Sequence, residues 1–144
     1  MSTIASMSDR RRNITIESDL GSEVHILGCL ADGRPDEDGQ ILDLDWLWNA
    51  VGRWLETSGT LRLGAGIVEV AGTVRELVRG EGGAVCLRAV VVTPEAVAAV
   101  REGTVKYGFG ITRPVVSVDP AAPMGRIAGG DVLSVFLDWE EAKP

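Results

Sequence analysis

The chain has few of the residues that build metal sites and nucleic-acid-binding surfaces. Among its 144 residues are one histidine and two cysteines, and 14 lysines and arginines stand against 21 aspartates and glutamates. There is no CxxC pair, and a single histidine cannot complete the usual nitrogen and sulfur ligand set of zinc. A formal net charge of −7 repels phosphate backbones. We therefore expect no metal, no other cofactor and no nucleic-acid partner.

Long apolar runs are also missing. The best candidate, 85–100, is interrupted by Arg88 and Glu95 and falls short of the roughly 18 residues that a membrane span needs. The first 12 residues lack the apolar stretch of a secretory signal. The sequence therefore predicts no membrane partner and synthesis in the cytoplasm.

The two cysteines, Cys29 and Cys86, each lie in an apolar, strand-like run. The preferred interpretation is a pair of buried thiols that act as small hydrophobic side chains. A disulfide is the alternative, which a reducing compartment disfavours.

Apolar residues make up 45% of the chain, enough for one ordinary hydrophobic core. We expect a flexible N-terminal arm over 1–12, a single domain over 13–139 and a polar tail over 140–144. This N-terminal segment carries Arg10, Arg11 and Arg12. This basic run is typical of a solvated, mobile segment, and docking on an acidic partner surface is the alternative.

Hydrophobic spacing predicts two helices among several strands. An apolar stripe at helical spacing runs over 43–58, with Asp43 as its N-cap and Gly59 as its stop. A short helix follows Thr93 and ends at Gly103. Period-two alternation predicts strands at 13–17, 23–30, 60–63, 67–78, 84–92, 107–113, 114–118 and 131–138. The expected fold class is α+β, a small β-barrel or a strongly curved, mostly antiparallel sheet of about seven strands with two flanking helices.

Four segments occur in an order that resembles a known family. They are Gly28–Val51, Thr60–Leu77, Val90–Ile111 and Val132–Asp138. The first contains Asp38, Gly39, Ile41 and Asp43 before a helix, and the third joins Pro-Glu-Ala to a later Gly-Phe step. Together they resemble the prohead proteases of tailed phages, capsid-maturation enzymes related in fold to herpesvirus assemblin. The resemblance covers roughly 22–138 and implies an assemblin-like fold.

The chain departs from this family at its two catalytic positions. The family places a histidine base just after the strand that matches 60–63, where this chain has Ala65 between two glycines. The family nucleophile is a serine after Gly-Phe, where this chain has Gly110. Acyl transfer needs a nucleophile and a base, and neither alanine nor glycine supplies one. The resemblance thus implies a protease fold without catalytic residues.

An active protease with relocated residues is the alternative. The single histidine is His25, and the serines nearest to apolar strands are Ser117 and Ser134. A His25–Ser134 pair would be the best replacement. A lone histidine in an apolar strand is more often structural, either half-exposed or hydrogen-bonded.

Candidate contact residues are aromatic. Trp46 lies off the apolar stripe of the first helix, and Trp139 follows the last strand. Tyr107 and Phe109 flank Gly108 on a strand that could bind another chain by edge pairing. The alternative is that the tryptophans cover a small cluster under a loop or the tail.

The leading hypothesis is an inactive prohead-protease-like protein that serves as a structural or assembly component of a phage capsid. Its expected partners are capsid, scaffold or protease proteins and further copies of itself. Its expected location is the host cytoplasm during assembly and, if it is retained, the virion. The alternatives are the relocated serine protease and an unrelated β-rich binding domain.

Overall fold

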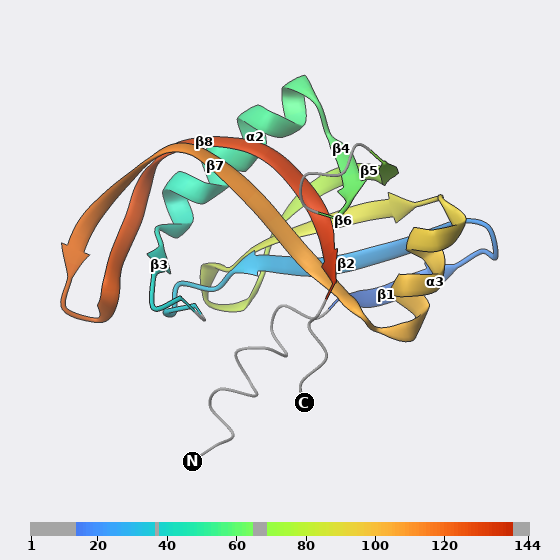
Figure 1. Cartoon of the computed structure of the whole chain (residues 1–144), viewed down its shortest axis with the longest axis horizontal. Coiled ribbons are helices and arrows are strands. Elements are labelled where there is room, and N and C mark those ends of the chain that lie inside the picture. Colours follow the sequence, from blue (N-terminus) through green and yellow to red (C-terminus); the bar gives the residue numbers. More distant parts are fainter. Residues whose placement is uncertain (1–13, 37, 65–68, 140–144) are drawn as a thin grey trace, which may run out of the picture.

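The computed structural model describes residues 14–36, 38–64 and 69–139, and the fold is taken from this part of the chain. It contains eight strands, two α-helices and one short 3-10 turn (Figure 1). In chain order they are β1 (Thr15–Asp19), β2 (Val24–Ala31), β3 (Ile41–Leu42), α2 (Leu44–Thr57), β4 (Thr60–Leu63), β5 (Val70–Arg79), η1 (Glu81–Gly83), β6 (Val85–Val91), α3 (Pro94–Glu102), β7 (Val105–Asp119) and β8 (Ala122–Trp139).

All eight strands belong to one sheet. Its order is β1-β2-β6-β5-β4-β8-β3, and β7 pairs with β8 outside this path. Strands β4 and β3 run parallel to β8, and the other pairings are antiparallel. Among the described strands the two ends of the path do not pair with each other, so the sheet stays open. The α+β class is confirmed. The sheet is open and mostly antiparallel, so of the two expected arrangements the barrel is not formed.

The core lies on the inner face of the sheet. In β2, Val24, Ile26 and Leu30 are buried while His25 and Leu27 are only half-buried, the alternation of a strand with one face in the core. Helix α2 packs against β8, β5 and β6. The buried side chains of both helices join the strands in one cluster, including Leu47, Val51, Trp54, Ala96, Val97 and Val100.

Both helices begin and end where the sequence predicts. The Asp43 carboxylate accepts a hydrogen bond from the Trp46 N–H at 2.9 Å and so caps α2. Gly59 follows α2 with a φ of 71°, a left-handed conformation that favours glycine. Pro94 starts α3, and Gly103 ends it with the same φ of 71°. Local capping chemistry therefore sets these boundaries.

The last two strands differ from the prediction. The sequence predicts two short strands at 107–113 and 114–118 and a separate strand at 131–138. The structure instead contains one long hairpin of β7 and β8 (Figure 1). The strand continues through Pro114 because the register shifts between Thr112 and Val115, where Arg113 adopts a φ of 51°.

The cysteines form a disulfide, which corrects the preferred interpretation of two free thiols. Cys29 of β2 and Cys86 of β6 are direct partners in the antiparallel pairing, so both side chains project from the same face. Their sulfur atoms are bonded, and 57 positions separate the two residues in the sequence. The sequence pattern placed each cysteine in a strand but could not show that these strands are neighbours.

We expect the disulfide to stabilise the fold mainly by restricting the unfolded chain. For a loop of this length, replacing both cysteines by alanine should lower the free energy of unfolding by about 2–4 kcal/mol. Urea unfolding of the oxidised protein and the double variant measures this difference. Two reactive thiols in the denatured, unreduced protein would contradict the disulfide.

An ion pair joins β1 to α3. The Arg101 guanidinium donates to both carboxylate oxygens of Asp19, at 2.8 and 2.6 Å, and to the Gly21 carbonyl. The Arg101 hydrogen bond, assisted by the Gly21 N–H, lowers the pKa of Asp19 from 3.8 to about 2. This contact fixes the edge strand to the helix that follows β6.

The Asp19 pair should make stability depend on pH in the acidic range. Because the folded-state pKa lies below the unfolded value, the contribution is full above about pH 4 and is lost as the pH falls toward 2. Wild type should therefore exceed Asp19→Asn in stability near neutral pH and converge with it near pH 2. Thermal unfolding over this range tests it, and Arg101→Gln should remove the dependence. A constant difference across the range would disprove this linkage.

Candidate functional site

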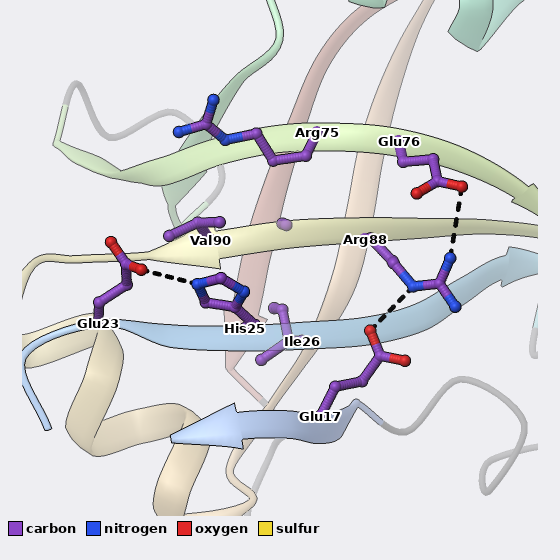
Figure 2. A pocket seen from close by; sticks show the side chains of 9 residues that line it. Glu17, Glu23, His25, Ile26, Arg75, Glu76, Arg88 and Val90 are labelled. Atoms are coloured by element: carbon purple, nitrogen blue, oxygen red, sulfur yellow. Dashed lines mark hydrogen bonds and ion pairs between the residues drawn. The ribbon is translucent and has the colours of Figure 1, made fainter. Parts of the chain in front are cut away.

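A polar groove lies on the outer face of the sheet, opposite the core. It has a volume of about 290 Å³ and crosses β1, β2, β6 and β5 (Figure 2). Nine residues line it: Glu17, Glu23, His25, Ile26, Arg75, Glu76, Arg88, Ala89 and Val90. The charged members come from different strands, and outward-facing positions on adjacent strands bring them together. We call this site the outer groove.

At one end of the groove, Glu23 and His25 form a pair. The Nε2 atom of His25 lies 2.7 Å from a carboxylate oxygen of Glu23, and both side chains are about two-fifths exposed. A carboxylate accepts hydrogen bonds, so this contact places a proton on Nε2. In the neutral ring, Nδ1 is then a hydrogen-bond acceptor. The prediction of a half-exposed, hydrogen-bonded histidine agrees with this arrangement.

At the other end, Arg88 of β6 lies between two carboxylates. Its Nε donates to Glu17 of β1 at 2.9 Å, and its Nη1 lies 3.4 Å from a carboxylate oxygen of Glu76 of β5 (Figure 2). Glu17 is the main cause of the raised pKa of the Arg88 guanidinium. The three side chains form a charge ladder across the sheet, in which Arg88 neutralises one of the two negative charges.

Arg75 has a different environment. It projects from β5 on the same side of the sheet, above Val90 and across from Glu23 and His25 (Figure 2). Within the described part of the chain, no carboxylate forms an ion pair with it. A register shift between Val74 and Glu76 explains why two successive side chains of β5 both reach the groove.

The lining can bind charged groups, but it contains no serine, threonine, cysteine or lysine that could act as a nucleophile. Ser18 of β1 is the register partner of His25 in β2. No hydrogen bond joins their side chains in the described structure, where the His25 ring bonds to Glu23. The sequence did not single out Ser18, because only the strand pairing places it beside the histidine.

Gly110, one of the two altered family positions, is not among the residues that line this groove. Gly110 of β7 pairs with Ser134 of β8, whereas Leu63 of β4 pairs with Leu137 on the other side of β8. Gly110 and the end of β4 are two strand spacings apart across the sheet and three residues apart along β8. Together these offsets give a distance of roughly 14 Å. Ala65 itself lies outside the described residues. The backbone thus does not bring the end of β4 beside Gly110.

The suggested His25–Ser134 pair is not present in the structure. The His25 side chain lines the outer groove, and neither Ser134 nor Ser117 belongs to its lining. The Ser134 hydroxyl instead lies beside Gly110. A Cβ atom added to that glycine would be 3.3 Å from the hydroxyl oxygen. Ser117 is exposed in the distal part of β7, with its hydroxyl 3.5 Å from the Arg126 carbonyl oxygen.

Two of the aromatic contact candidates belong to the core. Tyr107 is 3% exposed, its hydroxyl lies 3.3 Å from the Leu87 carbonyl, and burial raises its pKa. Phe109 is partly buried against the same core. The expectation that Tyr107 offers a surface contact is therefore wrong, because the inner face of β2 packs over its ring at Gly28.

The two tryptophans among the contact candidates differ in their surroundings. Trp46 of α2 packs against the core, and its indole N–H donates to the Gly130 carbonyl of β8 at 3.0 Å. It therefore anchors the hairpin within the molecule. Trp139 ends β8 with 41% of its surface exposed and is still available for contact.

Two further features of the described residues concern metal binding and membrane crossing. They contain no group of three or more histidine, cysteine, aspartate or glutamate side chains placed to hold a metal ion. None of their helices has the length and apolar character needed to cross a membrane. Comparison of the chain with protein-family models, curated proteins and solved structures finds no match.

Restoring a serine at the family position should not restore a reactive nucleophile. Gly110→Ser should fold, because the added side chain meets only the Ser134 hydroxyl at an adjustable distance. It should remain unlabelled by a fluorophosphonate, because no histidine lies beside it to take the proton. Intact-mass spectrometry of the folded variant checks this, with the denatured variant as control. A stoichiometric adduct on residue 110 would contradict the expectation.

Proposed function

We propose that this protein is a non-catalytic assembly component that acts by binding other protein chains, first of all a second copy of itself. The phage-capsid setting rests on the sequence resemblance to prohead proteases, and so does descent from an assemblin-like ancestor. The supporting structural observation is the distal half of the β7–β8 hairpin, residues 112–131. We call this segment the arm, and it is distinct from the N-terminal arm over 1–12.

The arm exposes apolar side chains that a lone domain has no reason to display. It projects past the rest of the sheet at the left of Figure 1. Val118 is 98% exposed, and Val115, Val116 and Met124 are each more than half exposed. Several exposed apolar side chains on one projecting segment support a contact surface at the arm.

The arm is held in a fixed position by α2 and the segment before it. The Asp43 N–H donates to the Ile127 carbonyl at 2.9 Å, and β3 pairs with Arg126 and Ile127. Trp46 adds its bond to Gly130, and Met124 donates to the Gly39 carbonyl. A surface fixed in this way loses little conformational entropy on binding.

One edge of β7 is open for pairing. In the described sheet β7 pairs with β8 alone, so its other edge offers backbone donors and acceptors to another strand. The run Val115–Val118 is uncharged, with Arg113 on one side and Asp119 on the other. Two copies paired antiparallel about Val116 place Arg113 of each opposite Asp119 of the other, whereas parallel pairing places like charges together. Asp119 also accepts from Arg126 at 2.8 Å, which keeps it ionised and in place.

The relocated serine protease has one supporting observation, the register pairing of Ser18 with a histidine already held by Glu23. A fluorophosphonate adduct on Ser18 of the folded protein, lost in His25→Ala, would establish this alternative and contradict the proposal. The proposal predicts no adduct on the wild-type chain.

Self-association should depend on the centre of the arm. Val116→Glu adds a charge at a site that is already 52% exposed, so the monomer should stay folded while pairing about this residue is lost. Sedimentation velocity should show a concentration-dependent dimer for wild type and a monomer for the variant.

The matched control is Val92→Glu, which makes the same change at a 48% exposed valine between β6 and α3. It should dimerise like wild type. Arg113→Glu should raise the dimer dissociation constant about tenfold, since both ends of the pairing then carry like charges. A wild-type protein that stays monomeric at high concentration, or equal dimerisation of all variants, would refute the proposed contact.

A further inference from the structure

The outer groove contains two groups of charged side chains, one whose members pair with one another and one whose members do not pair across the groove. Glu17, Arg88 and Glu76 satisfy one another across three strands at 2.9 and 3.4 Å. On the other side of the groove, Arg75 on β5 and the Glu23–His25 pair are separated by Val90, and no described side chain joins them. Figure 2 shows this open side, with the guanidinium above and the carboxylate and imidazole below.

The charges of the open side select against simple ions. An inorganic anion drawn to Arg75 would also face Glu23 and Glu76, on a chain whose net charge is −7. A bare cation would find Glu17 and Glu76 already bonded to Arg88, and Glu23 bonded to His25. A ligand that carries both signs can pair with Arg75 and Glu23 at once, without adding net charge.

Hydrogen bonding gives the ligand a direction. A carboxylate suits the forked guanidinium of Arg75. In the tautomer that donates from Nε2 to Glu23, the Nδ1 atom of His25 accepts a hydrogen bond, and an ammonium group can donate to it and to Glu23. The anionic end of the ligand therefore points to β5 and its cationic end to β2.

The floor and the size of the groove limit the rest of the ligand. Val90, which is partly exposed on the outer face of β6, supplies apolar surface between the two charged ends. The volume of about 290 Å³ lies at the small end of the range for small-molecule sites. This space fits an aliphatic dipeptide better than a nucleotide or a folded partner.

We propose that the outer groove is a binding site for a short zwitterionic ligand, an aliphatic dipeptide or amino acid. The carboxylate pairs with Arg75, the ammonium pairs with Glu23 and His25, and the aliphatic side chain lies on Val90. This site is separate from the arm, so binding does not depend on the proposed self-association.

The test is a titration of the full-length protein with alanyl-leucine, followed by the NMR signals of the His25 ring and of the backbone of β2, β5 and β6. N-acetyl-alanyl-leucine removes the ammonium and alanyl-leucinamide removes the carboxylate. Arg75→Gln and Glu23→Gln remove the matching protein charges, and Arg53→Gln on α2 is the control, because it deletes an exposed arginine outside the groove.

Wild type and Arg53→Gln should bind the free dipeptide equally, and Arg75→Gln and Glu23→Gln should each bind it about tenfold more weakly. The amide should bind wild type and Arg75→Gln alike, and the acetylated form should bind wild type and Glu23→Gln alike, because the partner charge is already missing. Retained backbone spectra show that the variants fold.

Absence of saturable shifts at about 10 mM dipeptide would overturn the proposal. Equal binding of the free, acetylated and amidated forms would also overturn it, as would inorganic phosphate that competes for the same signals. A difference in affinity between the dipeptide and a single amino acid, with the same dependence on both charges, would support the site and define the length of its ligand. Val116→Glu should bind the dipeptide as wild type does, so failure of the arm and failure of the groove give different results.

Discussion

Backbone pairing along β8 is the constraint on which the rest of the structure depends. This 18-residue strand pairs with the whole of β7 on one side and with β4 and β3 on the other. It connects the part of the sheet formed by β2, β6 and β5 to the arm, and α2 packs against it. The helix is fixed to β8 at both the backbone of Asp43 and the indole of Trp46. The direction of the arm therefore follows from the same hydrogen bonds that complete the sheet.

The two faces of the sheet have separate roles. The inner face carries the core and both helices, and its close packing leaves Tyr107 buried where the sequence suggested a contact. In the described part of the chain, no helix covers the outer face over the strands that line the groove, so charged side chains can meet across β1, β2, β6 and β5 (Figure 2). The Cys29–Cys86 disulfide joins β2 and β6 on this outer face. Stability and ligand chemistry thus draw on different faces of the same strands.

Local signals in the sequence predicted the helices well and the long hairpin poorly. Asp43, Gly59, Pro94 and Gly103 mark helix ends through capping and backbone conformation, which depend only on nearby residues. Pro114 reads locally as a break, but the shifted register at Arg113 lets the strand continue, and pairing with β8 stabilises it.

The same limit applies to the sites. The disulfide and the outer groove join segments far apart in sequence, and only strand order places them together. The Ser18–His25 pairing lies within one hairpin but depends on the shifted register between β1 and β2. The sequence predicted a structural role for His25 but offered no sign of Arg75, because a charged residue at a strand bulge cannot be told from a solvated one by sequence pattern. The family resemblance pointed to positions near Gly110, and the described backbone does not bring the end of β4 there.

Hydrogen exchange of the arm at different protein concentrations tests the central claim most directly. The open edge of β7 leaves backbone N–H groups unpaired in a monomer, and pairing with a second copy protects them. The account predicts that exchange over Val115–Val118 slows as concentration rises, while exchange in β2 and β6 around the outer groove stays constant. Exchange in the arm that is equally fast at low and high concentration would contradict a role in assembly through this edge.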